Sequence, residues 1–179
     1  MKGKKISCFL LSALFSVMSA IGQTNDESSS NQLKWLFQLT GSWKSKNATL
    51  QMGGKSYSFA YTADFKPVSD RNGLIMSENA DIPQIGKLMG TNLIGVSPWD
   101  GKVHWFSVDN LGTSHEHIGG FTDRNHFSMT YHGMQNQKDC VETVSVAFDG
   151  PDTIHIKQTE ILDGKTELVI TGSFFRKKS

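Results

Sequence analysis

Apolar and polar residues alternate with a period of two along most of this chain, from Ser42 to the C-terminal end. Such alternation is typical of strands with one buried and one exposed face, because successive side chains of a strand point to opposite sides. The clearest case is the segment 57–65, in which aromatic residues and one alanine alternate with small or polar residues. The pattern therefore predicts a protein built mainly of strands.

Turn-forming residues recur about every ten positions and divide this pattern into ten predicted strands. They cover residues 43–51, 57–65, 74–81, 91–97, 103–108, 113–121, 126–132, 141–148, 153–162 and 165–175. Asp163-Gly164 is the clearest hairpin signal, because both residues accept the positive φ that a two-residue turn requires. Residues 83–90, which hold a proline and two glycines, are predicted to form a loop.

No long helical pattern interrupts the strands, and their short links favour an up-and-down antiparallel arrangement. An open sheet of this size would leave two edges and one face uncovered, whereas a closed barrel removes both liabilities. The sequence thus predicts an all-β fold, an up-and-down antiparallel barrel of about ten strands. Ahead of it, Leu33, Leu36, Phe37 and Leu39 recur at helical spacing, which predicts a short helix over residues 32–39 that must pack against another element.

The first 22 residues have the layout of a signal peptide: a basic start, an apolar run over residues 6–18, and small residues before Gln23. The apolar run is shorter than the roughly 20 residues that a spanning helix needs, so we expect cleavage and no membrane span afterwards. The polar residues 23–31 lack periodicity and are predicted to be a disordered tether. Residues 32–179 are then a single barrel domain, exported to the periplasm or secreted.

Loss of the signal peptide removes three lysines, so 18 basic and 17 acidic residues become 15 and 17. The mature chain is slightly negative and has no basic stripe, which argues against a nucleic-acid partner. Cys140 is its only cysteine, which excludes an intramolecular disulfide. A lone thiol in a strand is more often a packed small hydrophobe than a nucleophile. No Gly-x-Ser-x-Gly motif is present either, so no catalytic residue is predicted.

All six histidines belong to the mature chain, and two of them share a strand face. His115 and His117 lie two residues apart, a spacing that can chelate a metal. Two nitrogens do not make a site, and the sequence does not indicate which strand would add a third ligand. Four glutamates fall mid-strand, but the sequence alone cannot pair them: Glu78, Glu116, Glu142 and Glu160. The prediction is therefore no metal and no cofactor, with hydrogen-bonding histidines.

The other four histidines are assigned a direction from their neighbours. Alternation places His126, His132 and His155 on the outside and leaves the direction of His104 open.

The segment 33–43, which ends in Gly41-Ser42-Trp43, resembles the Gly-x-Trp entrance of the lipocalin-like, or calycin, superfamily. With its strand number and the segment 95–120, the chain is similar to a secreted bacterial calycin-like family of unknown function. The resemblance implies that the short N-terminal helix caps one barrel end. It also implies that Trp43 packs across that end beneath an arginine, for which Arg176 is the candidate.

A nitrobindin-like haem protein is an alternative, because those proteins resemble this chain in strand number and hold haem through a late histidine. His155 is the late-strand candidate. The nitrobindin-like entrance has a glycine two residues after its tryptophan, and here Ser45 stands at that position.

The aromatic and methionine content indicates a wide apolar interior. A ten-stranded barrel is wider than the eight-stranded barrels that side chains just fill, which favours a cavity. We therefore expect an exported small-molecule-binding barrel, a carrier or sensor of a mostly apolar ligand, rather than an enzyme. The cavity candidates are Tyr61, Trp105, His115, His117, Met129 and Tyr131. The alternatives are an isomerase or hydrolase on a calycin scaffold, which would use cavity carboxylates and histidines, and a partner-binding module with a solid interior.

Overall fold

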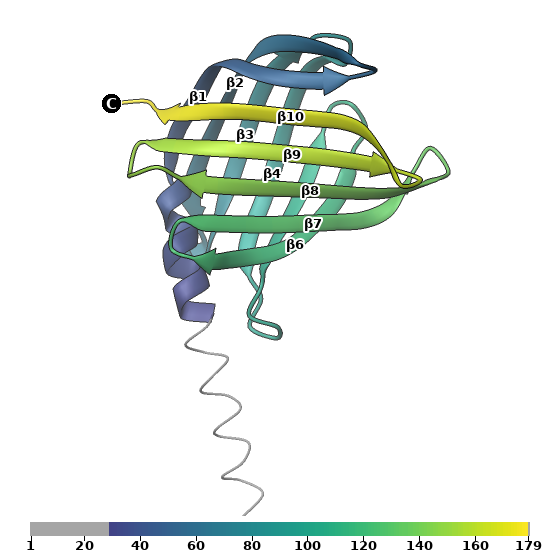
Figure 1. Ribbon diagram of the computed structural model, residues 1–179. Helices are drawn as coiled ribbons and strands as arrows, with labels where there is room; N and C mark the ends of the chain where they lie inside the picture. The colour runs from purple at the N-terminus through teal and green to yellow at the C-terminus, as the bar shows by residue number, and fades with distance from the viewer. Residues whose placement is uncertain (1–28, 179) are drawn as a thin grey trace, which may run out of the picture.

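The computed structural model describes residues 29–178, which form a closed barrel of ten antiparallel strands (Figure 1). The predicted signal peptide and most of the predicted tether lie outside the described residues. The strands are β1 (Gly41–Met52), β2 (Lys55–Val68), β3 (Gly73–Ile82), β4 (Gly86–Val96), β5 (Val103–Asp109), β6 (Ser114–Asp123), β7 (His126–Gln135), β8 (Lys138–Phe148), β9 (Thr153–Leu162) and β10 (Lys165–Arg176). Each strand pairs with its neighbours in the chain, and β1 pairs with β10. The predicted all-β, up-and-down barrel is confirmed.

All ten predicted strands are present, and the largest difference in boundaries concerns β4. This strand begins at Gly86, so the prediction of a loop through residue 90 is wrong. The two glycines of the segment hide its alternation, but its backbone pairs with β3 from Ile82↔Gly86 onward. Sheet pairing overrides the weak local preference of glycine for strands. The predicted Asp163-Gly164 hairpin is confirmed, since φ is 48° and 75° at these residues.

An N-terminal helix over residues 29–36 continues into the 3₁₀ turn η1 (Phe37–Leu39) and lies at one end of the barrel (Figure 1). The helix includes residues 29–31, which composition had assigned to a disordered tether, so that assignment is wrong for these three positions. Two of them, Ser30 and Asn31, are exposed on a helix whose apolar side chains come later. Leu36 and Leu39 are buried in the barrel core, which stabilises a helix too short to form alone.

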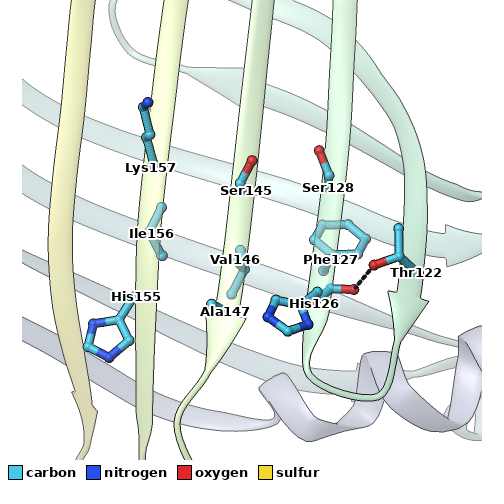
Figure 2. Close-up of a pocket in the computed structure, with 10 residues that line it drawn as sticks. All are labelled: Thr122, His126, Phe127, Ser128, Ser145, Val146, Ala147, His155, Ile156 and Lys157. Carbon is cyan, nitrogen blue, oxygen red and sulfur yellow. Dashed lines mark hydrogen bonds between the residues drawn. The ribbon is translucent and has the colours of Figure 1, made fainter.

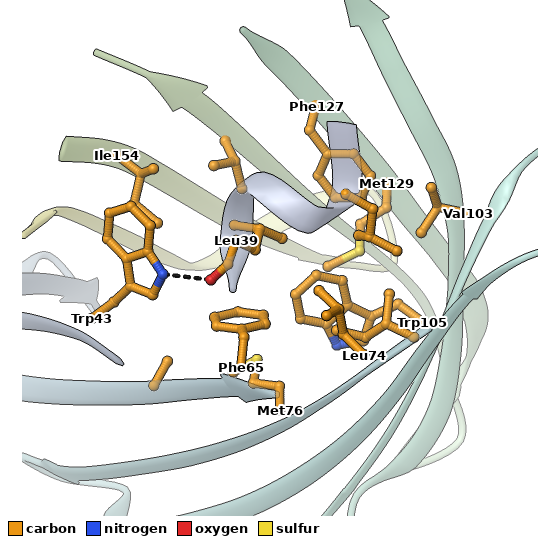
Figure 3. Packing of buried hydrophobic residues seen from close by; sticks show 14 of the residues in the cluster. Leu39, Trp43, Phe65, Leu74, Met76, Val103, Trp105, Phe127, Met129 and Ile154 are labelled. Atoms are coloured by element: carbon orange, nitrogen blue, oxygen red, sulfur yellow. Dashed lines mark hydrogen bonds between the residues drawn. The ribbon is translucent and has the colours of Figure 1, made fainter. Parts of the chain in front are cut away.

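The main hydrophobic core fills the barrel end that the helix covers (Figure 3). Trp43 is 1% exposed and donates a hydrogen bond from Nε1 to the carbonyl oxygen of Leu39 at 2.7 Å. The guanidinium of Arg176 lies over the Trp43 ring, 4.1 Å from its centroid. The helix, the tryptophan and the arginine are therefore arranged as the calycin resemblance implied.

A second buried cluster lies near the opposite end, on the side of β1, β2, β3 and β10. It consists of Ala48, Leu50, Phe59, Ala80, Ile82 and Leu168. The inward-facing positions of β5 to β9 near this end carry polar side chains instead, and these form the site described next. Within residues 29–178, no helix has the length and apolar character needed to cross a membrane.

Candidate functional site in the barrel interior

A belt of polar side chains crosses the barrel interior where the two apolar clusters meet at Tyr61. Asn92, His117 and Glu142 in this belt are 2%, 3% and 8% exposed. Burying polar groups costs free energy unless partners replace water, so such a belt is maintained only by specific contacts or by a bound molecule. It divides into two hydrogen-bonded groups.

The first group is centred on Glu78 of β3. Its carboxylate accepts hydrogen bonds from the Tyr61 hydroxyl and from Nδ2 of Asn92, the latter at 3.0 Å. Oδ1 of Asn92 in turn accepts from Nε1 of Trp105 at 3.0 Å and from the Ser107 hydroxyl. Four strands, β2 to β5, are thus linked inside the barrel through one carboxylate and one amide.

The second group brings together His115 and His117 of β6, Tyr131 of β7 and Glu142 of β8. Nε2 of His117 lies 3.1 Å from Oε1 of Glu142, and Nε2 of His115 lies 3.8 Å from Oε2 of Glu142. Oε1 of Glu142 also accepts a hydrogen bond from Nε2 of Gln158 at 2.8 Å. The two imidazoles therefore meet one carboxylate that a neighbouring strand holds in place.

The position of Tyr131 explains how Glu142 reaches across an intervening strand. Tyr131 stands directly opposite Glu142 in the β7–β8 register and would separate it from β6. Its ring instead lies over Gly133 and stacks on His115, with ring centroids 4.4 Å apart. Any Cβ at Gly133 would collide with the Tyr131 hydroxyl, so glycine there allows this tilt. The displaced ring leaves room for the contact between His117 and Glu142.

In this second group, the pKa of a histidine is lowered and the pKa of a neighbouring glutamate is raised. Burial lowers the pKa of His115; the nearby Glu142 charge raises it and the His117 charge lowers it, and the net shift is downward. Burial raises the pKa of Glu160, the register neighbour of Glu142, and the charge of Glu142 raises it further. Within the described residues, no lysine or arginine pairs with Glu142. The site is thus acidic, with His115 favoured in its neutral form.

One buried polar atom of the site has no hydrogen-bond partner in the described part of the chain. It is Nδ1 of His117, on a side chain that is 4% exposed. Leaving such a group unsatisfied costs about 1–3 kcal/mol. The imidazole nitrogens of His115 and His117 and the Glu142 carboxylate also lie within 4.8 Å of one another, and these are donor types that bind transition metals.

The sequence-predicted cavity residues separate into two sets. His115, His117 and Tyr131 come together at the site, and Tyr61 contributes to the Glu78 group beside it. Trp105 and Met129 belong to the apolar core, although Trp105 also donates to Asn92.

The four remaining histidines lie on the outside of the barrel wall, as alternation predicts for three of them. His126 and His155 have side chains 63% and 50% exposed, and His132 is also exposed. His104, whose direction the sequence left open, bonds Asp100 and Glu116 on the outer face. The outward direction of His155 does not fit a haem ligand in the barrel interior.

The sequence did not indicate the fourth member of the site, Glu142. It was recognised as a glutamate within a strand, but its partners depend on the register of β7 and on the tilt of Tyr131. Neither is visible in a single sequence. Asn92 and Gln158 were missed for the same reason, since polar inward positions do not stand out in an alternating pattern.

A shallow pocket of about 380 Å³ lies on the barrel wall formed by β7, β8 and β9 (Figure 2). His126 and His155 lie at its lower edge in this view, separated by Ala147, which pairs with both in the sheet. Its polar groups do not converge on a common point. The interior belt is therefore the stronger candidate site.

Comparisons with known proteins identify the fold but no family. No protein-family model matches the chain, and no curated protein matches its sequence. The structure is similar to the crystal structure of Rv2717c from M. tuberculosis, with a TM-score of 0.62, 16% identity, and coverage of 82% of this chain and 98% of that one. It is also similar to the S-type phycobiliprotein lyase CPES from Guillardia theta, with a TM-score of 0.58, 14% identity, and coverage of 82% and 92%. At these identities the similarities show the fold alone, a closed antiparallel barrel shared by the three proteins.

Proposed function

We propose that this protein is exported and binds a small molecule inside its barrel, at the group formed by His115, His117, Tyr131 and Glu142. The observation that carries the proposal is the unpartnered Nδ1 of the buried His117. A domain that used its interior only for stability would fill this position with an apolar side chain, because the unsatisfied nitrogen is costly. A bound molecule that hydrogen-bonds this nitrogen removes the cost.

The composition of the site indicates the kind of ligand. The Tyr131 ring, stacked on His115, offers an aromatic face for an apolar body. Glu142 and Glu160 make the polar side of the site acidic, so it favours a group that donates hydrogen bonds over an anion. We therefore propose a ligand with an apolar body and a donor group, more polar at one end than the mostly apolar ligand expected from the sequence.

The similarity to the phycobiliprotein lyase is in keeping with this proposal. The phycobiliprotein lyase shares the barrel, and its name describes a lyase of a phycobiliprotein. At 14% identity the likeness extends to the fold, so the ligand of this chain is proposed from its own residues.

Native mass spectrometry tests the binding proposal. We expect untagged protein, collected from the periplasm or medium of expressing cells, to carry a non-covalent mass that disappears on denaturation. His117→Asn should lose this mass, whereas the matched control His132→Asn, which changes an outward histidine on β7, should keep it. Wild-type protein free of any added mass, or equal retention in both variants, would count against the proposal.

Export is tested on the same material. We expect N-terminal sequencing of the protein outside the cytoplasm to begin at Gln23, after removal of residues 1–22. An intact N-terminus on cytoplasmic protein would contradict export and leave the binding proposal standing.

A further inference from the structure

The geometry points to a zinc-class divalent metal ion held by Nε2 of His115, Nε2 of His117 and the carboxylate of Glu142. This inference concerns the same interior group as the proposed function. The role of the metal in ligand binding rests on that proposed function. Metal binding itself stands on the donor set and is tested separately.

The donor atoms have the separations that a tetrahedral ion needs. Zinc binds histidine nitrogen at about 2.0–2.1 Å and carboxylate oxygen at about 2.0–2.2 Å, which places neighbouring donors about 3.3 Å apart. The carboxylate oxygens of Glu142 lie 3.1 Å from Nε2 of His117 and 3.8 Å from Nε2 of His115. All three donors fall within 4.8 Å of one another. Small side-chain rotations are enough to bring them around one ion.

The donors are supported by the rigid part of the fold. His115 and His117 project from alternate positions of one strand and are both paired with β5, whereas the pairing of β6 with β7 begins at Ile118. Gln158 donates to Oε1 of Glu142 at 2.8 Å and so orients the carboxylate. Such hydrogen bonds from outside the ligand set commonly fix metal-binding carboxylates.

The local charge also favours a cation. Within the described residues, no lysine or arginine pairs with Glu142, and its only ion-pairing neighbours are His115 and His117. Asp109 and Glu160 add further negative charge, since both act electrostatically on members of this group. A divalent ion would neutralise carboxylates that are costly to bury together.

Three protein ligands leave one tetrahedral position open. Two histidines and one glutamate are a set found in zinc sites that keep a position for water or a bound molecule. His115, whose side chain is 12% exposed, gives this side of the site contact with solvent. The open position is where a water molecule, or an oxygen, nitrogen or sulfur lone pair of a bound molecule, would coordinate the metal.

Metal titration of untagged mature protein tests the inference. After treatment with a chelator and dialysis, we expect about one zinc ion per chain by elemental analysis. Cobalt in its place should give visible d–d absorption of a site with nitrogen and oxygen ligands. Wild-type protein that binds neither ion more tightly than about 10 μM would overturn the inference.

Variants identify the ligands. We expect His115→Ala, His117→Ala and Glu142→Gln each to weaken zinc binding by about 100-fold or more, and Gln158→Leu to weaken it by about 10–100-fold. His132→Ala and Glu116→Gln alter outward residues on β7 and β6 and should bind like the wild type. Circular dichroism checks that each variant folds. If a ligand variant does not fold, the cobalt spectrum of the wild type tests whether nitrogen and oxygen ligands bind the metal. Unchanged affinity in all three ligand variants would refute this assignment.

The same samples separate this inference from the proposed function. A small molecule that stays bound after the metal is removed, in protein that does not rebind zinc, contradicts the metal site only. One zinc ion per chain with no small molecule in any preparation contradicts the proposed function only.

Discussion

At the scale of single residues, the Tyr61 hydroxyl is a hydrogen-bond partner of the interior carboxylate of Glu78. It donates to Oε2 of Glu78; burial, the Glu78 charge and this hydrogen bond raise the pKa of Tyr61 well above its ordinary value. The hydroxyl therefore stays a donor through the neutral range. We expect Tyr61→Phe to lower the free energy of unfolding by about 1–3 kcal/mol at pH 7, measured by urea unfolding, because Glu78 loses a partner.

Tyr57→Phe is the matched control for this experiment. Tyr57 lies on the same strand, and no hydrogen bond of its hydroxyl is found within residues 29–178. The Tyr57→Phe variant should unfold close to the wild-type urea concentration. Equal losses in the two variants would show that the Tyr61 hydrogen bond contributes nothing beyond packing.

The pKa values of His104 and His115 are shifted in opposite directions, so NMR titration can distinguish the two histidines. Burial lowers the pKa of His104, but hydrogen bonds to Glu116 and Asp100 raise it, and the net shift is upward from 6.5. The pKa of His115 is shifted downward from 6.5, first by burial. In metal-free protein, we expect His104 to titrate above 6.5 and His115 below it, and Glu116→Gln to lower the pKa of His104.

The signs for stability follow from the same shifts. The folded state holds the His104 proton more tightly than the unfolded state, so this contribution is full below pH 6.5 and is lost as pH rises through the raised value. For His115 the folded state disfavours the proton, so stability falls as pH drops below 6.5. A common titration midpoint for both histidines would contradict these assignments.

At the scale of elements, the N-terminal helix is joined to the barrel through the amide of Gln32. Its Nε2 donates to the Phe121 carbonyl oxygen at 2.9 Å, and its Oε1 accepts from the Phe121 amide at 2.7 Å. The β5–β6 pairing ends at Val103↔Gly119, so Gln32 replaces a missing strand partner for Phe121. We expect Gln32→Ala to lower the free energy of unfolding by about 1–3 kcal/mol and to accelerate hydrogen exchange at Phe121.

Asn31→Ala, which changes an exposed neighbour on the same helix, is the control and should leave the Phe121 exchange rate unchanged. Slow exchange at Phe121 in the Gln32→Ala variant would mean that another group supplies the missing partner.

The elements were largely predictable because period-two alternation and turn residues are local signals. The Asp163-Gly164 hairpin was predicted from two adjacent residues, and its φ values of 48° and 75° confirm it. The start of β4 at Gly86 was not, because pairing with β3 is a property of two distant segments. The same distinction governs the site: the shared face of His115 and His117 is local, whereas their meeting with Glu142 depends on register across three strands.

At the scale of the whole molecule, Arg176 joins the parts that close the barrel. It stands opposite Trp43 in the β1–β10 register, and its guanidinium lies over the Trp43 ring. The same group donates to the carbonyl oxygens of Gln38, Thr40 and Pro151. One side chain therefore connects the first strand, the last strand, the segment after the N-terminal helix and the turn between β8 and β9.

Arg176→Lys keeps the positive charge but removes the planar fork that reaches several acceptors at once. We expect it to lower the free energy of unfolding by about 2 kcal/mol or more, because hydrogen bonds at about 0.5–1.5 kcal/mol each and the stacking on Trp43 are lost together. Hydrogen exchange should rise at Leu39 and Trp43, at the capped end of the barrel. Lys177→Ala, at the exposed neighbouring cation, should change neither quantity. Wild-type stability in Arg176→Lys would show that charge alone holds this end closed and that the planar geometry is dispensable.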